Sequence, residues 1–398
     1  MTDIKTTESK GAESSQTVQQ VGKSAAPTSV WSASAPWLIA IFGFGLGIIC
    51  YFLYRNGSEE LFPALSSRPA STTRNILSLI PEDDLGYTFQ TLIQTPNVAK
   101  ARDFIMSPSG GWLILLNDRL NFYRNGAIPS AFVVDYPKFC NKTALKQVDS
   151  VCWDPVASTE DNPVLFLGSR SGIVQYRVET QPIESEAKTE AKTEAETEAK
   201  TETEKPLADS ASLLFTDGFT ERSVITCLLA DATRIYVADA GKGEARIYDR
   251  ETGKRSSVLT PPEGRFSAPS PYMDLALDAS GVVWVADPGR HRIVPFKPDG
   301  TCLESLIWGA PGQDLPRFCG CCNPSHFLIL PDGRFMTAEK KMPRVKIYSE
   351  SGVWETAVAG EDQLNADSKT VVQIAVAPDG WVYVLDPDKK RIVVFREK

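Results

Sequence analysis

The sequence predicts an all-β domain built from repeated units and preceded by one transmembrane helix. Three observations support this prediction: residues 36–54 form an uncharged apolar run, one strand–turn–strand pattern recurs six times after residue 86, and the copies are about 50 residues apart. The apolar run has the length of a membrane span. The recurrence is typical of repeat proteins, in which each unit buries its faces against its neighbours.

The composition excludes one broad class of function. The chain has 398 residues, of which 42% are hydrophobic, and a net charge of −8. A negatively charged chain offers no basic surface to hold nucleic acid, so we expect no nucleic-acid partner. Residues 1–35 are rich in Ser, Thr, Ala, Gln and Lys. They have few large apolar side chains to offset the entropy of folding, and we expect a disordered tail.

Residues 36–54 predict the transmembrane helix. The segment PWLIAIFGFGLGIICYFLY holds 19 residues without a charge, which at about 1.5 Å per residue is enough to cross the hydrocarbon core. Trp37, Tyr51 and Tyr54 stand where aromatic side chains meet the membrane interface. The run starts too late and is too long for a cleaved signal peptide. We therefore expect a retained anchor, followed by a linker at residues 55–85.

Six copies of one repeat follow the linker. Each reads as a short apolar run, a Pro-Asp-Gly type turn, a second run that ends in Ala-Asp in the clearer copies, and a third run that begins near Arg-Ile or Arg-Val. In chain order the copies occupy residues 108–126, 162–178, 235–253, 275–300, 327–352 and 374–395. The equivalent positions in the second run are Trp112, Val164, Ile235, Val283, Phe335 and Trp381.

One interval between these positions is longer than the others. The spacings are 52, 71, 48, 52 and 46 residues, and the long one contains residues 184–205, ESEAKTEAKTEAETEAKTETEK. Without those 22 residues the interval becomes 49, which matches the period of the rest. Because the segment has no apolar face to dock, we interpret it as a solvated insertion in one loop.

Repeats of this length, with several short strands each, suit the four-stranded blades of a β-propeller. The patterns VADPGRHRIVPF (285–296) and PDG resemble NHL repeats, most closely in the last three copies. The resemblance implies a six-bladed NHL-like β-propeller over residues 86–398. The last copy stops at Lys398 after its third strand. We therefore expect residues 86–94 to supply the missing outer strand and close the ring.

The side of the membrane depends on two opposing signals. Lys23 precedes the span, whereas Arg55, Arg68 and Arg74 follow it, and this count mildly favours a cytoplasmic propeller under the positive-inside rule. Large domains, however, cross largely regardless of charge, and anchored NHL-like propellers resemble exported sensor or scaffold domains. From that resemblance we expect an extracytoplasmic propeller, periplasmic if the source is bacterial.

Polar residues share one position on the innermost strands. Aligning those strands by the turns that follow them brings six side chains to the mouth of the central channel: Asp103, Ser150, Thr226, Asp274, His326 and Gln373. A water-filled channel needs a polar lining, and this alone accounts for the pattern. The alternative is a divalent-metal or small-ligand site in which Asp103, Asp274 and His326 act as ligands and Gln373 assists.

The segment FCGCCNPSH (318–326) is the most unusual local feature. It connects the fourth copy to the fifth on the same face as the polar ring. Three interpretations stay open: disulfides that include Cys140 in the corresponding loop between the first two copies, a metal site, or free and redox-active thiols. The spacing matches no zinc-ribbon or haem motif. The metal and redox interpretations use Cys319, Cys321, Cys322 and His326.

These features lead to three hypotheses of function. The first is a membrane-anchored binding or scaffold propeller, an accessory part of a membrane complex with a protein partner on its channel-mouth face. The second is a metal-dependent hydrolase or lyase at the channel, as the lactonase-like and peptidylglycine-lyase-like relatives of the fold imply. The third is a redox or metal-handling protein that uses the CGCC loop. The sequence contains no Gly-x-Ser-x-Gly elbow, phosphate loop or dinucleotide fingerprint, which favours the first hypothesis.

Overall fold

The computed structural model describes residues 80–95, 101–117, 119–123, 132–135, 145, 147–159, 163–177, 211–366 and 370–398. Nearly all of its regular structure is β-strand, which confirms the all-β part of the predicted fold class. Outside the described residues lie the predicted tail (1–35), the predicted transmembrane helix (36–54), most of the linker and the charged insertion (184–205). Within the described ranges, no helix has the length and hydropathy needed to cross a membrane.

Six antiparallel sheets make up the domain, and we number them as blades in chain order. Blade 1 consists of β2 (Asp103–Met106), β3 (Trp112–Leu115), β4 (Arg119–Tyr123) and β5 (Phe132–Asp135). Blade 2 consists of β6 (Ser150–Trp153), β7 (Val164–Ser169), β8 (Gly172–Arg177) and β9 (Ala211–Phe215). Blade 3 consists of β10 (Ile225–Ala230), β11 (Arg234–Asp239), β12 (Glu244–Asp249) and β13 (Arg255–Leu259).

Blade 4 consists of β14 (Leu275–Leu277), β15 (Val283–Asp287) and β16 (Arg292–Phe296). Blade 5 consists of β17 (His326–Ile329), β18 (Phe335–Glu339), β19 (Arg344–Tyr348) and β20 (Trp354–Ala359). Blade 6 consists of β21 (Gln373–Val376), β22 (Val382–Asp386), β23 (Arg391–Glu397) and β1 (Tyr87–Gln94). The short helical elements are η2 (Glu82–Asp84), η4 (Pro288–Arg290), η5 (Glu304–Leu306) and α4 (Glu361–Leu364).

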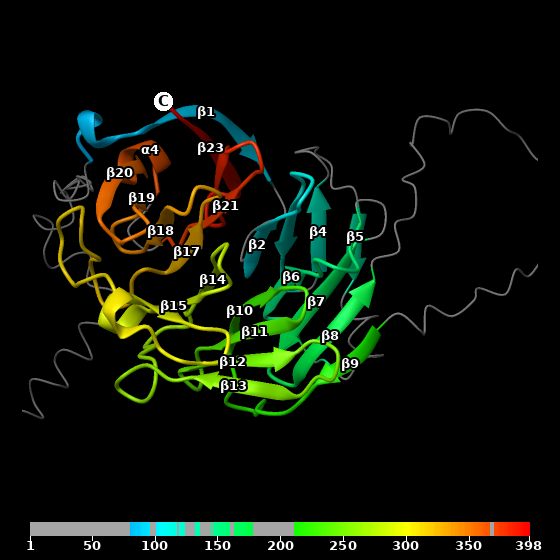
Figure 1. Ribbon diagram of the computed structural model, residues 1–398. Coiled ribbons are helices and arrows are strands. Elements are labelled where there is room, and N and C mark those ends of the chain that lie inside the picture. The colour runs from blue at the N-terminus through cyan, green and yellow to red at the C-terminus, as the bar shows by residue number, and fades with distance from the viewer. Residues whose placement is uncertain are drawn as a thin grey trace, which may run out of the picture. The chain divides into compact units, whose positions relative to one another are not determined.

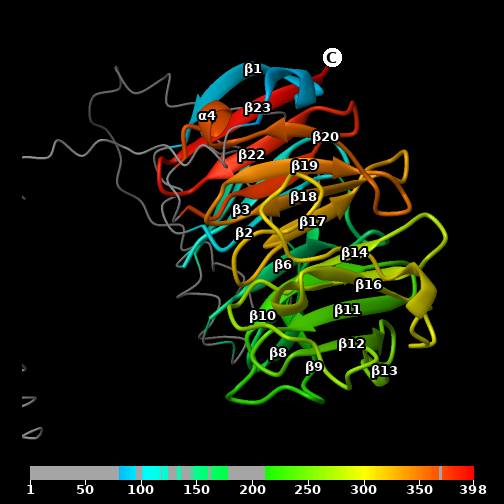
Figure 2. The same ribbon diagram turned by 90° about the vertical axis from the view of Figure 1, so that its left-hand side faces the viewer.

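The first strand of each blade lies innermost. Each of these strands contacts the first strand of the next blade, and β21 contacts β2, so the ring is closed. Figure 1 shows the innermost strands around a common centre, with β5, β9, β13, β20 and β1 at the periphery. Figure 2 shows the strands of blade 3 running side by side. A closed ring of radially arranged antiparallel sheets is a β-propeller.

The hydrophobic core is divided among the blade-to-blade interfaces. The buried apolar side chains of the described residues form six clusters, and each cluster joins two neighbouring blades. Phe166 of blade 2 and Tyr248 of blade 3, for example, belong to one cluster. Middle strands such as VWVAD (283–287) are therefore buried throughout, because both of their faces are covered by other blades.

The predicted closure of the ring by residues 86–94 is confirmed. β1 pairs antiparallel with β23, from Tyr87 opposite Glu397 to Gln94 opposite Arg391. The amide of Lys398 donates a further hydrogen bond of 3.0 Å to the carbonyl of Gly86. Blade 6 is thus assembled from both ends of the described chain, and β23 is left without a free edge.

The register of the repeat is also confirmed. The six predicted second-run positions coincide with the first residues of β3, β7, β11, β15, β18 and β22 to within one residue. The Pro-Asp-Gly segments of blades 5 and 6 form the expected turns between the first and second strands. In blade 5 the amide of Gly333 bonds to the carbonyl of Leu330 at 2.9 Å, and Gly333 has a φ of 89°, which glycine adopts at little cost.

Blade 4 differs from the predicted four-stranded pattern, because no regular fourth strand follows β16 in its sheet. Its sheet has three strands, and the next segment makes only isolated bridges, Phe296 with Cys302 and Ile293 with Trp308. Pro295 provides a physical reason. Its carbonyl accepts from the amide of Leu303 at 2.9 Å, so its nitrogen faces the same outer edge and has no hydrogen to donate there.

Candidate functional site

The six predicted ring residues lie at the same end of the innermost strands. Four of them are the first residues of their strands: Asp103, Ser150, His326 and Gln373. Asp274 immediately precedes β14, and Thr226 is the second residue of β10. The connections that enter each innermost strand lie at this end, so this end of the channel is the face that also carries the cysteine loop.

Two carboxylates of the ring bind the backbone of the following blade. Asp103 Oδ2 accepts from Ser150 Oγ at 2.8 Å and from the amide of Val151 at 3.0 Å. Asp274 Oδ2 accepts from the amide of Phe327 at 2.9 Å and lies 3.2 Å from His326 Nδ1. Each carboxylate therefore fastens its own blade to the next one.

Two neutral ring residues do the same with backbone carbonyls. Thr226 Oγ1 donates to the carbonyl of Met273 at 2.7 Å, from blade 3 to blade 4. Gln373 Nε2 donates to the carbonyl of Arg102 at 3.0 Å, from blade 6 to blade 1. Together with Asp103 and Asp274, these side chains bridge four of the six blade-to-blade interfaces. Sequence alignment located the ring but did not predict this role.

Burial and the charges of neighbouring ring residues shift the pKa values of Asp103 and His326. Burial raises the pKa of Asp103 to about 6, against the hydrogen bonds from Val151 and Ser150, which lower it. Burial lowers the pKa of His326, but the hydrogen bond and the negative charge of Asp274 outweigh it, so the net shift is upward. The ring thus favours a protonated imidazole at His326 and holds at Asp103 a carboxyl that is partly neutral in mildly acidic solution.

Of the predicted metal ligands, Asp274 and His326 are in contact, but they gain no third ligand among the described residues. Among the described residues, no group of three or more His, Cys, Asp or Glu side chains is placed to hold a metal ion. The divalent-metal interpretation of Asp103, Asp274, His326 and Gln373 therefore lacks its ligand set, because both carboxylates are turned toward neighbouring backbone amides. The same geometric result applies to the metal interpretation of the cysteine loop, with Cys319, Cys321, Cys322 and His326.

Two cavities meet at the ring. The first, which we call the inner cavity, has a volume of about 450 Å³ and is lined mainly by apolar residues of the innermost strands, such as Phe104, Leu228 and Ile374. The second, which we call the vestibule, has a volume of about 390 Å³ and opens on the face of the cysteine loop. Thr226 and His326 line both cavities, so the ring separates an apolar chamber from one of mixed polarity.

The vestibule presents polar groups of several kinds. Arg102 and Asp149 form an ion pair of 2.7 Å in its wall, and Tyr272 and Asp388 also line it. Gln373 is only 7% exposed, and its Oε1 has no hydrogen-bond partner among the residues that the structure describes. A buried acceptor without a partner is costly, and because Gln373 Oε1 is itself shielded from solvent, the side chain must rotate before a donor in the vestibule can reach it.

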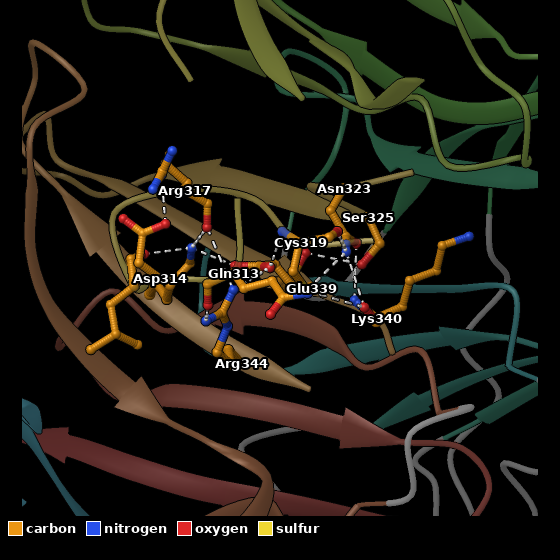
Figure 3. Close-up of polar contacts among 12 residues, drawn as sticks. Gln313, Asp314, Arg317, Cys319, Asn323, Ser325, Glu339, Lys340 and Arg344 are labelled. Atoms are coloured by element: carbon orange, nitrogen blue, oxygen red, sulfur yellow. Dashed lines mark hydrogen bonds and ion pairs between the residues drawn. The ribbon is translucent and has the colours of Figure 1, made fainter. Parts of the chain in front are cut away.

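A buried network of hydrogen bonds connects the cysteine loop to the end of β18. The amide of Cys319 donates to Glu339 Oε2 at 3.0 Å. Asn323 Nδ2 donates to the carbonyl of Cys319 at 2.6 Å and to that of Lys340 at 3.0 Å, and Asn323 Oδ1 accepts from the amide of Lys340 at 3.0 Å. Figure 3 shows these side chains between the loop and the turn that follows β18. The loop backbone is therefore fixed at both of its ends.

Glu339 is the centre of that network. Its carboxylate pairs with Arg344 at 2.8 Å and with Lys346, and all three side chains are fully buried. Burial would raise the pKa of Glu339, but the charges of Lys346 and Arg344 outweigh it and lower the pKa. Arg344 Nη1 also donates to the carbonyl of Gln313 at 2.9 Å, as Figure 3 shows. The cluster ties the segment before the loop to blade 5.

The cysteines described by the structure are free thiols, so no disulfide is formed among Cys319, Cys321 and Cys322. Cys140, the predicted disulfide partner, lies outside the described residues. Cys321 and Cys322 are in contact: the thiol of Cys322 donates to Cys321 Sγ at 3.3 Å. Cys321 is exposed and Cys322 is buried. Lys341 Nζ donates to Cys321 Sγ at 3.3 Å.

The environments of the thiols differ in charge. The hydrogen bond from Cys322, followed by the one from Lys341, lowers the pKa of Cys321. Burial, reinforced by the negative charge of Glu339, raises the pKa of Cys319 to about 12. Of Cys319 and Cys321, the exposed Cys321 is therefore the one whose surroundings favour a thiolate.

Contacts link the thiol pair to the vestibule wall. Ser270 Oγ donates to Cys322 Sγ at 3.1 Å, and Lys340 Nζ donates to Ser270 Oγ at 3.0 Å. Lys340 Nζ lies 4.1 Å from the ring centroid of Tyr272, which lines the vestibule. Sequence reasoning missed these residues. The repeat register could have indicated Lys340 and Lys341, because they lie in the turn after the second strand of blade 5, and each such turn lies at the ring end of the channel.

No protein-family model matches the chain, and no curated protein matches it in sequence. Three solved structures are similar at 8–12% identity and TM-scores of 0.42–0.43. A protein of unknown function from Bacteroides caccae is 9% identical, with 65% of this chain and 81% of that chain covered and a TM-score of 0.43. A streptogramin B lyase is 12% identical, with 76% and 81% covered and a TM-score of 0.42. Virginiamycin B lyase from Staphylococcus aureus is 8% identical, with 78% and 100% covered and a TM-score of 0.43.

Proposed function

We propose that the chain is a membrane-anchored binding propeller of the NHL type, which receives a protein partner at its vestibule and serves as an accessory part of a membrane complex. The observation that carries the proposal is the vestibule itself, a cavity of about 390 Å³ at the channel mouth. It contains a buried acceptor, Gln373 Oε1, that lacks a partner within the described residues.

The chemistry of the vestibule suits a peptide segment of a partner. Rotation of the Gln373 side chain toward the vestibule would allow a backbone amide of an inserted loop to donate to its Oε1 and satisfy it. Tyr272 and Arg102 in the wall are of the residue types enriched at protein interfaces. The rim carries both signs of charge, from Arg102, Asp149 and Asp388, so a partner can be oriented without a large net charge on either side.

Photo-crosslinking in native membranes tests the partner. A photoreactive phenylalanine analogue at position 272 should give a discrete adduct, because this side chain lines the vestibule. The matched control is position 353, a valine that is 63% exposed and lies between β19 and β20. Adducts of equal yield at both positions, or none at position 272 while the protein is folded and in its membrane, would refute a partner at the vestibule.

The proposed anchor is residues 36–54, with the propeller on the extracytoplasmic side. If this is correct, the full chain stays with membranes after extraction with alkaline carbonate, because only detergent dissolves the lipid around an apolar helix. Protease added to intact cells, after the outer envelope has been permeabilised, should reach the propeller. Release by carbonate would contradict the anchor, and protection from the protease until the inner membrane is broken would reverse the orientation.

A further inference from the structure

We propose that Cys321 and Cys322 form a thiol–disulfide exchange site, in which a low-molecular-weight disulfide oxidises the pair to a disulfide between the two adjacent cysteines. This goes beyond the proposed binding function and does not depend on it. It rests on the geometry of the cysteine loop, in which two thiols of different exposure are held in contact beside a lysine ammonium.

The two thiols are arranged for different roles. Cys321 is exposed, and its sulfur accepts from Lys341 Nζ at 3.3 Å, a contact that stabilises a thiolate. Cys322 is 1% exposed, so an external disulfide has little access to it, but its sulfur is only 3.3 Å from that of Cys321. Cys321 is therefore the attacking thiol, and Cys322 is the resolving thiol.

The other cysteines of the described chain are less suited to the reaction. Cys319 is 3% exposed and lies beside the negative charge of Glu339, which opposes its thiolate. Cys152 and Cys227 are buried within β6 and β10. Cys302 is partly buried and forms its bridge with Phe296 in the outer part of blade 4. Among the six cysteines that the structure describes, an exposed thiol and a contacting ammonium group occur together at Cys321 alone.

The proposed reaction balances in two steps. The Cys321 thiolate attacks one sulfur of the oxidant, RSSR; an S–S bond to Cys321 forms, the S–S bond of the oxidant breaks, and RS⁻ leaves. The Cys322 thiol then gives its proton to solvent, and its thiolate attacks the sulfur of Cys321, which releases a second RS⁻. Two protein thiols are oxidised by two electrons, and one external disulfide is reduced to two thiols.

The sequence position of the pair makes the product easy to reduce. Consecutive Cα atoms are about 3.8 Å apart across a trans peptide, below the separation of roughly 4.4–6.8 Å that an unstrained disulfide prefers. A constrained and exposed disulfide is reduced more readily than a relaxed one. The buried contacts of Glu339 and Asn323 hold the loop around the pair in either state. We therefore infer a reversible site and not a structural cross-link.

The experiment follows the thiols of the full chain in detergent. The protein is reduced, freed of reductant and exposed to oxidised glutathione; remaining thiols are alkylated, and the tryptic peptide that spans residues 318–334 is identified by mass spectrometry. The parent protein should form a disulfide between Cys321 and Cys322. Cys322→Ser should stop at a stable mixed disulfide on Cys321. Cys321→Ser should react at least about tenfold more slowly, and Cys302→Ser should behave as the parent.

Further variants make the result decisive. Lys341→Gln should slow formation of the mixed disulfide several-fold and leave the melting temperature unchanged, because Lys341 is exposed. Loss of the disulfide in Cys319→Ala, with melting unchanged, would assign the reaction to Cys319 and overturn the proposal. So would a parent protein that forms neither product while denatured protein does. Cys322→Ala serves as a second resolving-thiol variant if the serine variant melts early.

Discussion

Asp103 and Glu339 are two enclosed carboxylates whose pKa values shift in opposite directions. Burial raises the pKa of Asp103 to about 6, because its hydrogen-bond donors, Ser150 and the amide of Val151, are neutral. Glu339 is more deeply buried, yet its pKa is lowered, because Lys346 and Arg344 lie against it. In this pair the two opposite charges around Glu339 outweigh its burial, whereas the two neutral donors to Asp103 do not.

The difference separates two regions of one face. The network around Glu339 is a rigid support for the cysteine loop, since its charges are matched within the protein. The burial of Asp103 in the ring is not balanced by a neighbouring cation, so binding of a proton or of an incoming hydrogen-bond donor can change the charge or the contacts of this carboxylate. The function that we propose uses the second region, and the exchange site that we infer is held in place by the first.

The largest expected loss of stability comes from removing Glu339 from its buried ion pairs with Arg344 and Lys346. Glu339→Ala leaves Arg344 and Lys346 buried without their counter-ion, and we expect it to lower the free energy of unfolding by about 3–5 kcal/mol, measured by urea denaturation. Asp332→Ala is the matched control, since Asp332 forms an exposed ion pair with Arg334 at 2.7 Å. It should cost at most about 1 kcal/mol. Equal losses in the two variants would remove the distinction between buried and exposed pairs.

An intermediate effect is expected at the ring. Asp274→Ala removes the acceptor of the Phe327 amide, and an unsatisfied buried donor costs about 1–3 kcal/mol. Asp274→Asn keeps an acceptor oxygen at that place and should recover part of the loss. Thermal unfolding of the two variants beside the parent provides the measurement. If asparagine were as damaging as alanine, the charge and not the hydrogen bond would hold blades 4 and 5 together.

The smallest expected effect is a change in pH dependence. The folded-state pKa of Asp103 lies above its unfolded value of 3.8, so the folded state binds more protons between about pH 4 and 6, and Asp103 makes the protein less stable as the pH rises through that range. Asp103→Asn should remove this downward component. Glu339 acts with the opposite sign, because its lowered pKa contributes stability that is lost as the pH falls. Identical pH profiles for the parent and Asp103→Asn would contradict the assignment.

The fold was largely predictable because each repeat is a short sequence pattern of apolar runs and turn residues that can be recognised locally. Strand alternation, turn residues and a period near 50 residues located the blades, and the short last copy indicated the closure by β1. The four-stranded pattern fails in blade 4, where Pro295 has no donor to offer a fourth strand.

The candidate site was predictable in position but not in contacts. Strand alignment found Asp103 and Asp274, whereas their partners Val151 and Phe327 lie about 50 residues further on and meet them only in the folded ring. The support of Cys319 by Glu339 is of the same kind. No local signal in a single sequence marks a contact that depends on the angle between two blades.

The pairing of β1 with β23 has a consequence for biosynthesis. Tyr87 and Glu397 are neighbours in the sheet, but the ribosome makes them some 300 residues apart, and at roughly 5–20 residues per second the second strand follows the first by about 15 to 60 s. During that interval β1 is a strand without a partner, and such strands tend to pair wrongly. Its sequence YTFQTLIQ is mostly exposed even in the finished sheet. Its threonines and glutamines therefore suit it to remain in water until translation of the chain delivers its partner.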